Sequence, residues 1–138
     1  MKVQRAENPA ILAGHLAARR FFAPCFNDAA ASHEQLWVAH LDDAARCIHL
    51  ARHDGHDGHD GAVGLSVRSI IADAARLGST GVVLAHNHPS GDPTPSASDC
   101  RATRQLAAAG EAMDLAVVDH LVFAAGGECR SFRRMGLL

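Results

Sequence analysis

Residues 81–99 limit the possible folds of this chain more than any other segment. The apolar run at 81–85 predicts a buried strand, and it leads directly into HNHPSGDPTPSASD. Alternate side chains of a strand share one face, so His86 and His88 can bind a single metal ion. Prolines and a glycine then force a loop, after which Ser96 begins a helix that returns Asp99 toward the strand. Two histidines and one carboxylate predict a catalytic zinc site with a position left for water.

The same residues have simpler interpretations. Ser96 and Asp99 fit a helix capping box, in which the aspartate bonds back to the start of the helix. That role and metal binding compete for one carboxylate, and we favour the metal because His86 and His88 stand at the matching distance. Both histidines could also be ordinary core or turn residues, although a buried strand seldom ends in such a pair.

Composition indicates one globular domain. The 138 residues are 48% hydrophobic and 20% charged, with a formal net charge of −2, which favours neither disorder nor a polyanionic partner such as a nucleic acid. No apolar run approaches the ~20 residues needed to cross a bilayer. The N-terminal residues lack the apolar centre of a signal peptide. We therefore expect a cytoplasmic protein without membrane contact.

The N-terminal third predicts a helix, a linker and a hairpin. Asn8 and Pro9 form a capped helix start, followed by apolar residues at helical spacing, which predicts a first helix of about three turns. Residues 29–32 are typical of a linker, so we divide the chain into residues 1–32, helix and linker, and residues 33–138, the main domain. Apolar runs at 36–41 and 47–50 predict two paired strands.

Residues 53–61 repeat the tripeptide His-Asp-Gly three times. Glycine disfavours regular structure, and low-complexity tracts of this composition are usually solvated loops. The tract could bind metal, but we expect no specific metal role for it.

Beyond the tract, helices and strands alternate. Ser66 can cap a helix that ends at Gly78, and a second helix is expected from Ser96 to Gly110. Residues 115–123 predict a central strand, and Gly126-Gly127 turns the chain into a short last strand at 129–132. We expect an α/β fold with a mixed β-sheet flanked by helices.

The spacing His-x-His-Pro, followed by Ser96 and Asp99, resembles the zinc motif of JAB/MPN (JAMM) metalloproteases. The string AHNHPSGDPTPS is similar to the RadC-like branch of that family. Further matches are Leu41-Asp42, Thr103, Asp119-His120 and the terminal SF…GLL, so the resemblance extends from about residue 34 to the C-terminus. It implies the JAB fold, which is related to that of cytidine deaminases. RadC-like proteins usually have a strand and a Gly-Thr turn where this chain has its His-Asp-Gly tract, which puts the local strand in doubt. Full-length RadC proteins carry a helix-hairpin-helix region ahead of this domain, so we expect the catalytic module alone.

The resemblance also implies roles for site residues. JAMM proteases use a glutamate on an earlier segment as general base, and Glu34 matches it best, with Glu111 and Glu128 as rivals in less similar contexts. Ser96 matches the residue that donates to the oxyanion of the tetrahedral intermediate. His120 either orients a metal ligand or belongs to an ordinary buried pair with Asp119.

The resemblance therefore implies a zinc-dependent metallohydrolase, a peptidase or isopeptidase that uses a zinc-bound water on a peptide or protein substrate. The alternative is a non-catalytic RadC-like module associated with DNA repair, although the basic residues are scattered and only Arg130, Arg133 and Arg134 cluster. A zinc nucleobase deaminase is disfavoured, because its His-x-Glu and Pro-Cys-x-x-Cys motifs are missing from the sequence. The sequence indicates neither the substrate nor the oligomeric state.

Overall fold

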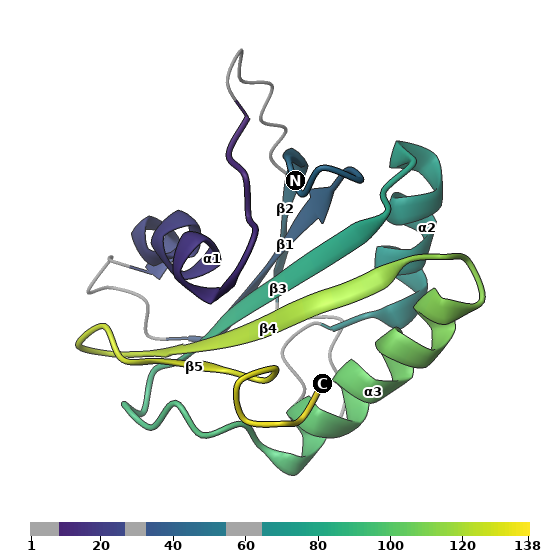
Figure 1. Ribbon diagram of the computed structural model, residues 1–138. Coiled ribbons are helices and arrows are strands. Elements are labelled where there is room, and N and C mark those ends of the chain that lie inside the picture. The colour runs from purple at the N-terminus through teal and green to yellow at the C-terminus, as the bar shows by residue number, and fades with distance from the viewer. Residues whose placement is uncertain (1–8, 27–32, 55–64) are drawn as a thin grey trace.

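The computed structural model describes residues 9–26, 33–54 and 65–138 (Figure 1). A five-stranded mixed sheet has the strand order β2-β1-β3-β4-β5, and only β3 and β4 among its neighbouring pairs are parallel. The strands are β1 (Gln35–Leu41), β2 (Cys47–Asp54), β3 (Gly81–His88), β4 (Ala116–Ala124) and β5 (Cys129–Ser131). The helices are α1 (His15–Phe22), the short 3-10 helix η1 (Ala23–Phe26), α2 (Val67–Leu77) and α3 (Ala97–Glu111). The predicted α/β fold with a mixed sheet and flanking helices is confirmed.

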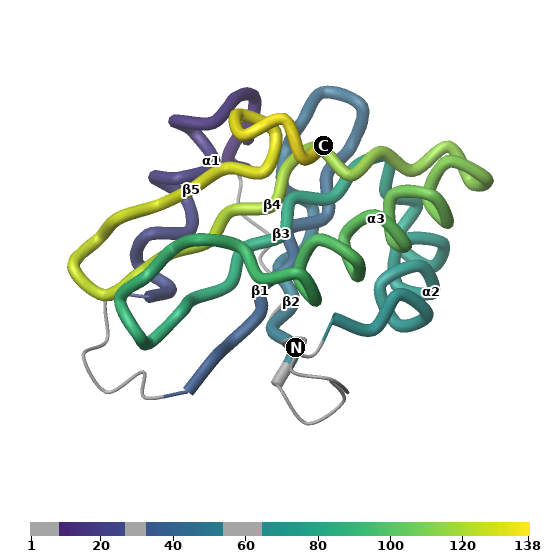
Figure 2. The backbone as a smooth tube through the Cα atoms, turned by 90° about the horizontal axis from the view of Figure 1, so that it is seen from below, coloured from purple at the N-terminus to yellow at the C-terminus, as the bar shows by residue number. Residues whose placement is uncertain are grey.

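Helices cover both faces of the sheet (Figure 2). On one face, α2 and α3 pack over a cluster that includes Leu36, Val82 and Leu106. On the other face, α1 packs over a second cluster that includes Phe22, Val83 and Leu121. Successive residues of β3 thus point to opposite layers, as strand geometry requires. Within the described ranges, no helix is both long and apolar enough to span a membrane.

Local signals set the bounds of α2 and α3. The Ser66 side chain accepts a hydrogen bond from the backbone N–H of Ser69, and Gly78 ends α2 in the left-handed conformation with φ of 69°. At the end of α3, the chain folds back so closely that a Cβ added to Gly110 would lie 2.5 Å from the carbonyl oxygen of Leu115. Only glycine therefore fits at position 110 without a backbone shift, and the two predicted helices are confirmed.

The predicted start of the first helix is wrong. The helix begins at His15 after Gly14, whose φ is 94°, and residues 9–14 are not helical. The backbone N–H of Leu12 donates to the carbonyl of Ala45, and that of Cys47 donates to the carbonyl of Ala10, both at 2.8 Å. Residues 10–12 therefore pair with the turn between β1 and β2, a contact that local helical spacing cannot reveal.

The second strand is longer than expected. It continues to Asp54, and His53 and Asp54 pair with Leu36 and Gln35 of β1. The first two residues of the His-Asp-Gly tract are therefore in a regular strand, contrary to the expectation that the tract is loop throughout. The rest of the tract and the linker predicted at 29–32 lie outside the described residues, and the domain boundary stays a prediction.

Candidate metal centre

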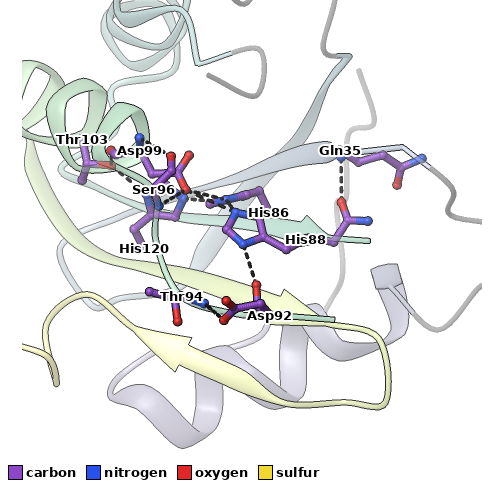
Figure 3. Close-up of polar contacts among 10 residues, drawn as sticks. Gln35, His86, His88, Asp92, Thr94, Ser96, Asp99, Thr103 and His120 are labelled. Atoms are coloured by element: carbon purple, nitrogen blue, oxygen red, sulfur yellow. Dashed lines mark hydrogen bonds and ion pairs between the residues drawn. The ribbon is translucent and has the colours of Figure 1, made fainter. Parts of the chain in front are cut away.

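The predicted metal ligands meet where β3 ends and α3 begins (Figure 3). His86 and His88 are the antepenultimate and last residues of β3, so their side chains point to the face covered by α2 and α3. Asp99 stands in the first turn of α3, on the helix that follows the loop. Ligands commonly bind beyond the carboxyl ends of strands in α/β sheets. The structure brings all three side chains together.

Three atoms define the centre. The Nε2 atoms of His86 and His88 lie 2.9 Å apart, and Oδ2 of Asp99 lies 3.4 Å from the first and 3.2 Å from the second. The side chains of His86 and Asp99 are almost completely buried, and that of His88 is 12% exposed. Within the part of the chain that the structure describes, this is the one group of three or more histidine, cysteine or acidic side chains whose arrangement could hold a metal ion.

The hydrogen bond of the His88 nitrogen that faces away from the centre indicates which of its two ring nitrogens is protonated. Nδ1 of His88 lies 2.8 Å from the carbonyl oxygen of Asp92, which can only accept, so Nδ1 carries the proton. A neutral His88 then presents a lone pair at Nε2 toward the lone pairs of Asp99. Such close acceptors repel one another unless a proton or a metal cation lies between them. A divalent metal ion fits that requirement, and nitrogen and oxygen donors of this kind suit zinc.

The Asp99 carboxylate completes the helix cap and also faces both histidines. The Ser96 side chain accepts from the backbone N–H of Asp99, and Oδ2 of Asp99 accepts from the backbone N–H of Ser96, which completes the capping box. The same oxygen faces both histidines. Although burial opposes ionisation, the neighbouring His86 and His88 and the backbone N–H of Ser96 hold the pKa of the Asp99 carboxyl well below its usual range. The cap therefore positions the carboxylate and does not compete with the histidines for it.

His120 lies directly behind His86. Its Nε2 atom is 2.7 Å from Nδ1 of His86, and its ring stacks on Phe132 with centroids 4.5 Å apart. Asp119 points away from the site, where its carboxylate accepts from the Ser131 hydroxyl at 2.5 Å and from the backbone N–H of Arg133. Asp119 also accepts from the backbone N–H of His120 at 2.8 Å, so the two residues are paired through the backbone while the His120 ring contacts the candidate ligand His86. That ring contact is the one needed to orient a ligand.

Glu34 immediately precedes β1 on the same face of the sheet. Leu36 pairs with His86 in the antiparallel ladder, which places Glu34 beside the end of β3. Burial raises the pKa of Glu34, the neighbouring charges of His86 and His88 lower it, and Asp99 raises it, with a net upward shift. A half-buried glutamate with a raised pKa next to the centre has the properties of a general base.

Asn87 holds the segment that carries Glu34. Its Oδ1 accepts from the backbone N–H of Gln35 at 2.7 Å, and its Nδ2 donates to the carbonyl of His33 at 3.3 Å. These two bonds fix the backbone on both sides of Glu34. No local signal in the sequence shows that a side chain between two candidate ligands bonds a segment more than fifty residues earlier.

The rival glutamates are elsewhere. Glu111 is the last residue of α3 and Glu128 lies in the turn before β5, and both are exposed. Ser96 lies beside the centre as the N-cap of α3. Thr103, buried on α3, was noted only as a matching position, although its place four residues after Asp99 puts it on the same side of the helix.

Comparisons with known proteins agree with this geometry. The family model described as RadC-like JAB domain matches residues 14–137. A UPF0758 protein of Symbiobacterium thermophilum is 51% identical over 71 residues, which cover 51% of this chain and 30% of the relative. A UPF0758 protein of Chloroflexus aurantiacus is 42% identical over 76 residues, covering 55% of this chain and 33% of the relative. The aligned segments thus span about a third of these relatives, whose names state no activity. The chain belongs to the RadC-like JAB domain family.

Proposed function

We propose that this chain is a zinc-dependent hydrolase of the JAMM type, a peptidase or isopeptidase. The observation that carries the proposal is the cluster of three acceptor atoms from His86, His88 and Asp99, with Glu34 beside it. A zinc ion at three protein ligands supplies a Lewis acid that activates water for attack on a carbonyl group.

The protein residues supply the remaining steps. Glu34, with its raised pKa, accepts a proton from the attacking water and returns it to the leaving amine. The hydroxyl of Ser96 accepts a hydrogen bond from Asp99 N–H at 3.0 Å, so its own proton remains available to an oxyanion. The hydrogen bonds from the Asn87 side chain to the backbone of His33 and Gln35 keep Glu34 beside the centre.

The non-catalytic nucleic-acid alternative has less support. The basic cluster that the sequence suggested is Arg130, Arg133 and Arg134, and the Arg133 guanidinium donates to the carbonyls of Val118 and Val117 at 2.6 and 3.3 Å. The Arg133 guanidinium therefore binds the backbone of β4. A net charge of −2 adds no general attraction to phosphate.

The test separates metal binding from catalysis. Metal analysis of purified protein identifies the ion, since two histidines and a carboxylate also suit ferrous iron. Zinc-loaded protein is then screened against peptide and isopeptide libraries. Glu34→Gln should keep zinc and lose roughly a hundredfold to ten-thousandfold in rate, because an amide cannot accept the proton. Glu111→Gln, an exposed change on the same chain, is the matched control and should retain full activity.

Two outcomes would count against the proposal. Full activity of Glu34→Gln on any substrate found would place the general base elsewhere. Fully zinc-loaded wild-type protein that cleaves nothing in the libraries would favour the non-catalytic alternative.

A further inference from the structure

Thr103 makes two hydrogen bonds with a single hydroxyl. Its Oγ1 lies 2.7 Å from the backbone carbonyl oxygen of Asp99 and 2.8 Å from Nδ1 of His120, and the residue is completely buried. A hydroxyl has one proton, and a carbonyl oxygen can only accept. The Thr103 proton therefore goes to Asp99, and Thr103 Oγ1 accepts a proton from His120 Nδ1–H.

The direction of that bond determines the next one. With its proton on Nδ1, the neutral His120 ring has a lone pair on Nε2, which lies 2.7 Å from Nδ1 of His86. His86 must then donate from Nδ1–H, and its Nε2 is left unprotonated and facing His88 and Asp99. Figure 3 shows this line of side chains from Thr103 through His120 to the centre.

We propose that Thr103 is a positioning residue that sets the proton direction in the chain Thr103–His120–His86, so that His86 presents an unprotonated Nε2 to a metal ion. This inference rests on the proposed metal-dependent function. In this proposal α3 contributes to the centre from two successive turns. Asp99 is a metal ligand, and Thr103 fixes the tautomer of the ligand His86 on β3.

Hydrogen bonds that ran in the opposite direction along this chain would prevent metal binding. If the Thr103 hydroxyl donated to His120, every proton in the chain would shift, and His86 would carry a proton on Nε2. That proton could bond the neighbouring His88 nitrogen 2.9 Å away, which would compete directly with a metal ion. The backbone carbonyl of Asp99 favours the arrangement in which Thr103 accepts from His120, because a hydroxyl 2.7 Å from a carbonyl oxygen is stable only when it donates its proton to that oxygen.

Two variants at position 103 isolate the hydroxyl. Thr103→Val keeps the branched shape and loses the hydrogen bonds, whereas Thr103→Ser keeps the hydroxyl. Zinc affinity is measured with Zn²⁺ alone by competition with a chelator. We expect Thr103→Val to bind zinc about 10- to 100-fold more weakly, as for the loss of other outer partners of metal ligands, and Thr103→Ser to stay close to the wild type.

Thr80→Val is the matched control. Its hydroxyl also donates to a backbone carbonyl, that of Leu41, at a site away from the centre, so its zinc affinity should not change. Nitrogen-15 NMR of the histidine rings in the zinc-loaded wild type gives a second readout that requires no variant. We expect the proton on Nδ1 of His86, His88 and His120.

The outcomes separate this inference from the function on which it rests. A wild type that binds no metal at the centre would end both. A wild type that binds zinc, with Thr103→Val binding it equally well, would overturn the role of Thr103 alone. A His120 ring protonated on Nε2 in the zinc-loaded wild type would do the same, even if Thr103→Val failed to fold.

Discussion

Two pairs of histidines lie on the same face of the sheet, at opposite ends, and they differ in their partners. His86 and His88, at the end of β3, face a carboxylate, and both of their outer nitrogens are engaged. His40 and His49 pair across β1 and β2 with ring centroids 5.8 Å apart. Their Nε2 atoms are buried without a hydrogen-bond partner.

The comparison shows what a metal centre requires beyond histidines on a strand. Nδ1 of His40 lies 2.9 Å from the Ser79 hydroxyl. Among the residues that the structure describes, no acidic side chain completes a ligand set with this pair. Burial, followed by the charge of His49, lowers the pKa of His40 to about 4, so it is neutral in the core. At the β3 end, the capped start of α3 supplies the carboxylate that the other pair lacks.

Removing that carboxylate should give the largest effect. Asp99→Asn leaves a neutral side chain among the histidines, and we expect zinc affinity to fall by more than the roughly 100-fold that loss of an outer partner costs. The matched change at the other group, His49→Gln, should leave affinity unchanged. Chelator competition on both proteins measures the difference, and equal losses in the two variants would mean that the groups have been assigned wrongly.

The N-terminal caps of α2 and α3 provide the next contrast. Ser96 and Ser66 each cap a helix, so replacement of either by alanine should cost about 1 kcal/mol of stability. Only Ser96→Ala should also slow hydrolysis, by roughly a hundredfold or more if its hydroxyl serves the oxyanion. Denaturant unfolding and rate measurements on the same preparations separate the two effects. Equal rates for both variants would remove Ser96 from the chemistry.

The histidine pair His40 and His49 should make the stability of the protein depend on pH. Between pH 6.5 and about 4, the unfolded chain binds a proton at His40 that the folded protein does not. The free energy of unfolding should therefore fall as pH drops through this window, by roughly 1 kcal/mol per pH unit for one such histidine. His40→Leu should have a shallower slope. An unchanged slope in this variant would show that His40 is accessible to protons in the folded state.

The His-Asp-Gly tract should give the smallest effect. Replacing His56 and His59 with serine should remove weak zinc binding at most, and should change neither the tight site nor the melting temperature. His53 is left intact because it lies in β2 and pairs with Leu36 of β1. A drop of many degrees in melting temperature would show that the tract has a structural role.

The sequence predicted those features that local patterns determine. Apolar spacing and serine caps gave α2 and α3, and the His86, His88 and Asp99 motif gave three residues that the fold brings together. The start of α1 was missed because the backbone bonds of residues 10–12 go to residues 45 and 47.

Two features of the candidate site depend on pairing between distant elements. Asn87 reaches His33 and Gln35, and Thr103 reaches His120 on a neighbouring strand. One-dimensional spacing contains no information on which strand lies beside which. These supporting contacts therefore became visible only with the register of the sheet.

Crystals of zinc-loaded protein, measured on both sides of the zinc absorption edge, test the metal centre most directly. We expect one strong anomalous peak bounded by Nε2 of His86, Nε2 of His88 and the carboxylate of Asp99, with the Glu34 carboxylate within reach of a water molecule beside it. A peak at His40 and His49 instead, or no peak at the end of β3 in protein saturated with zinc, would contradict the assignment.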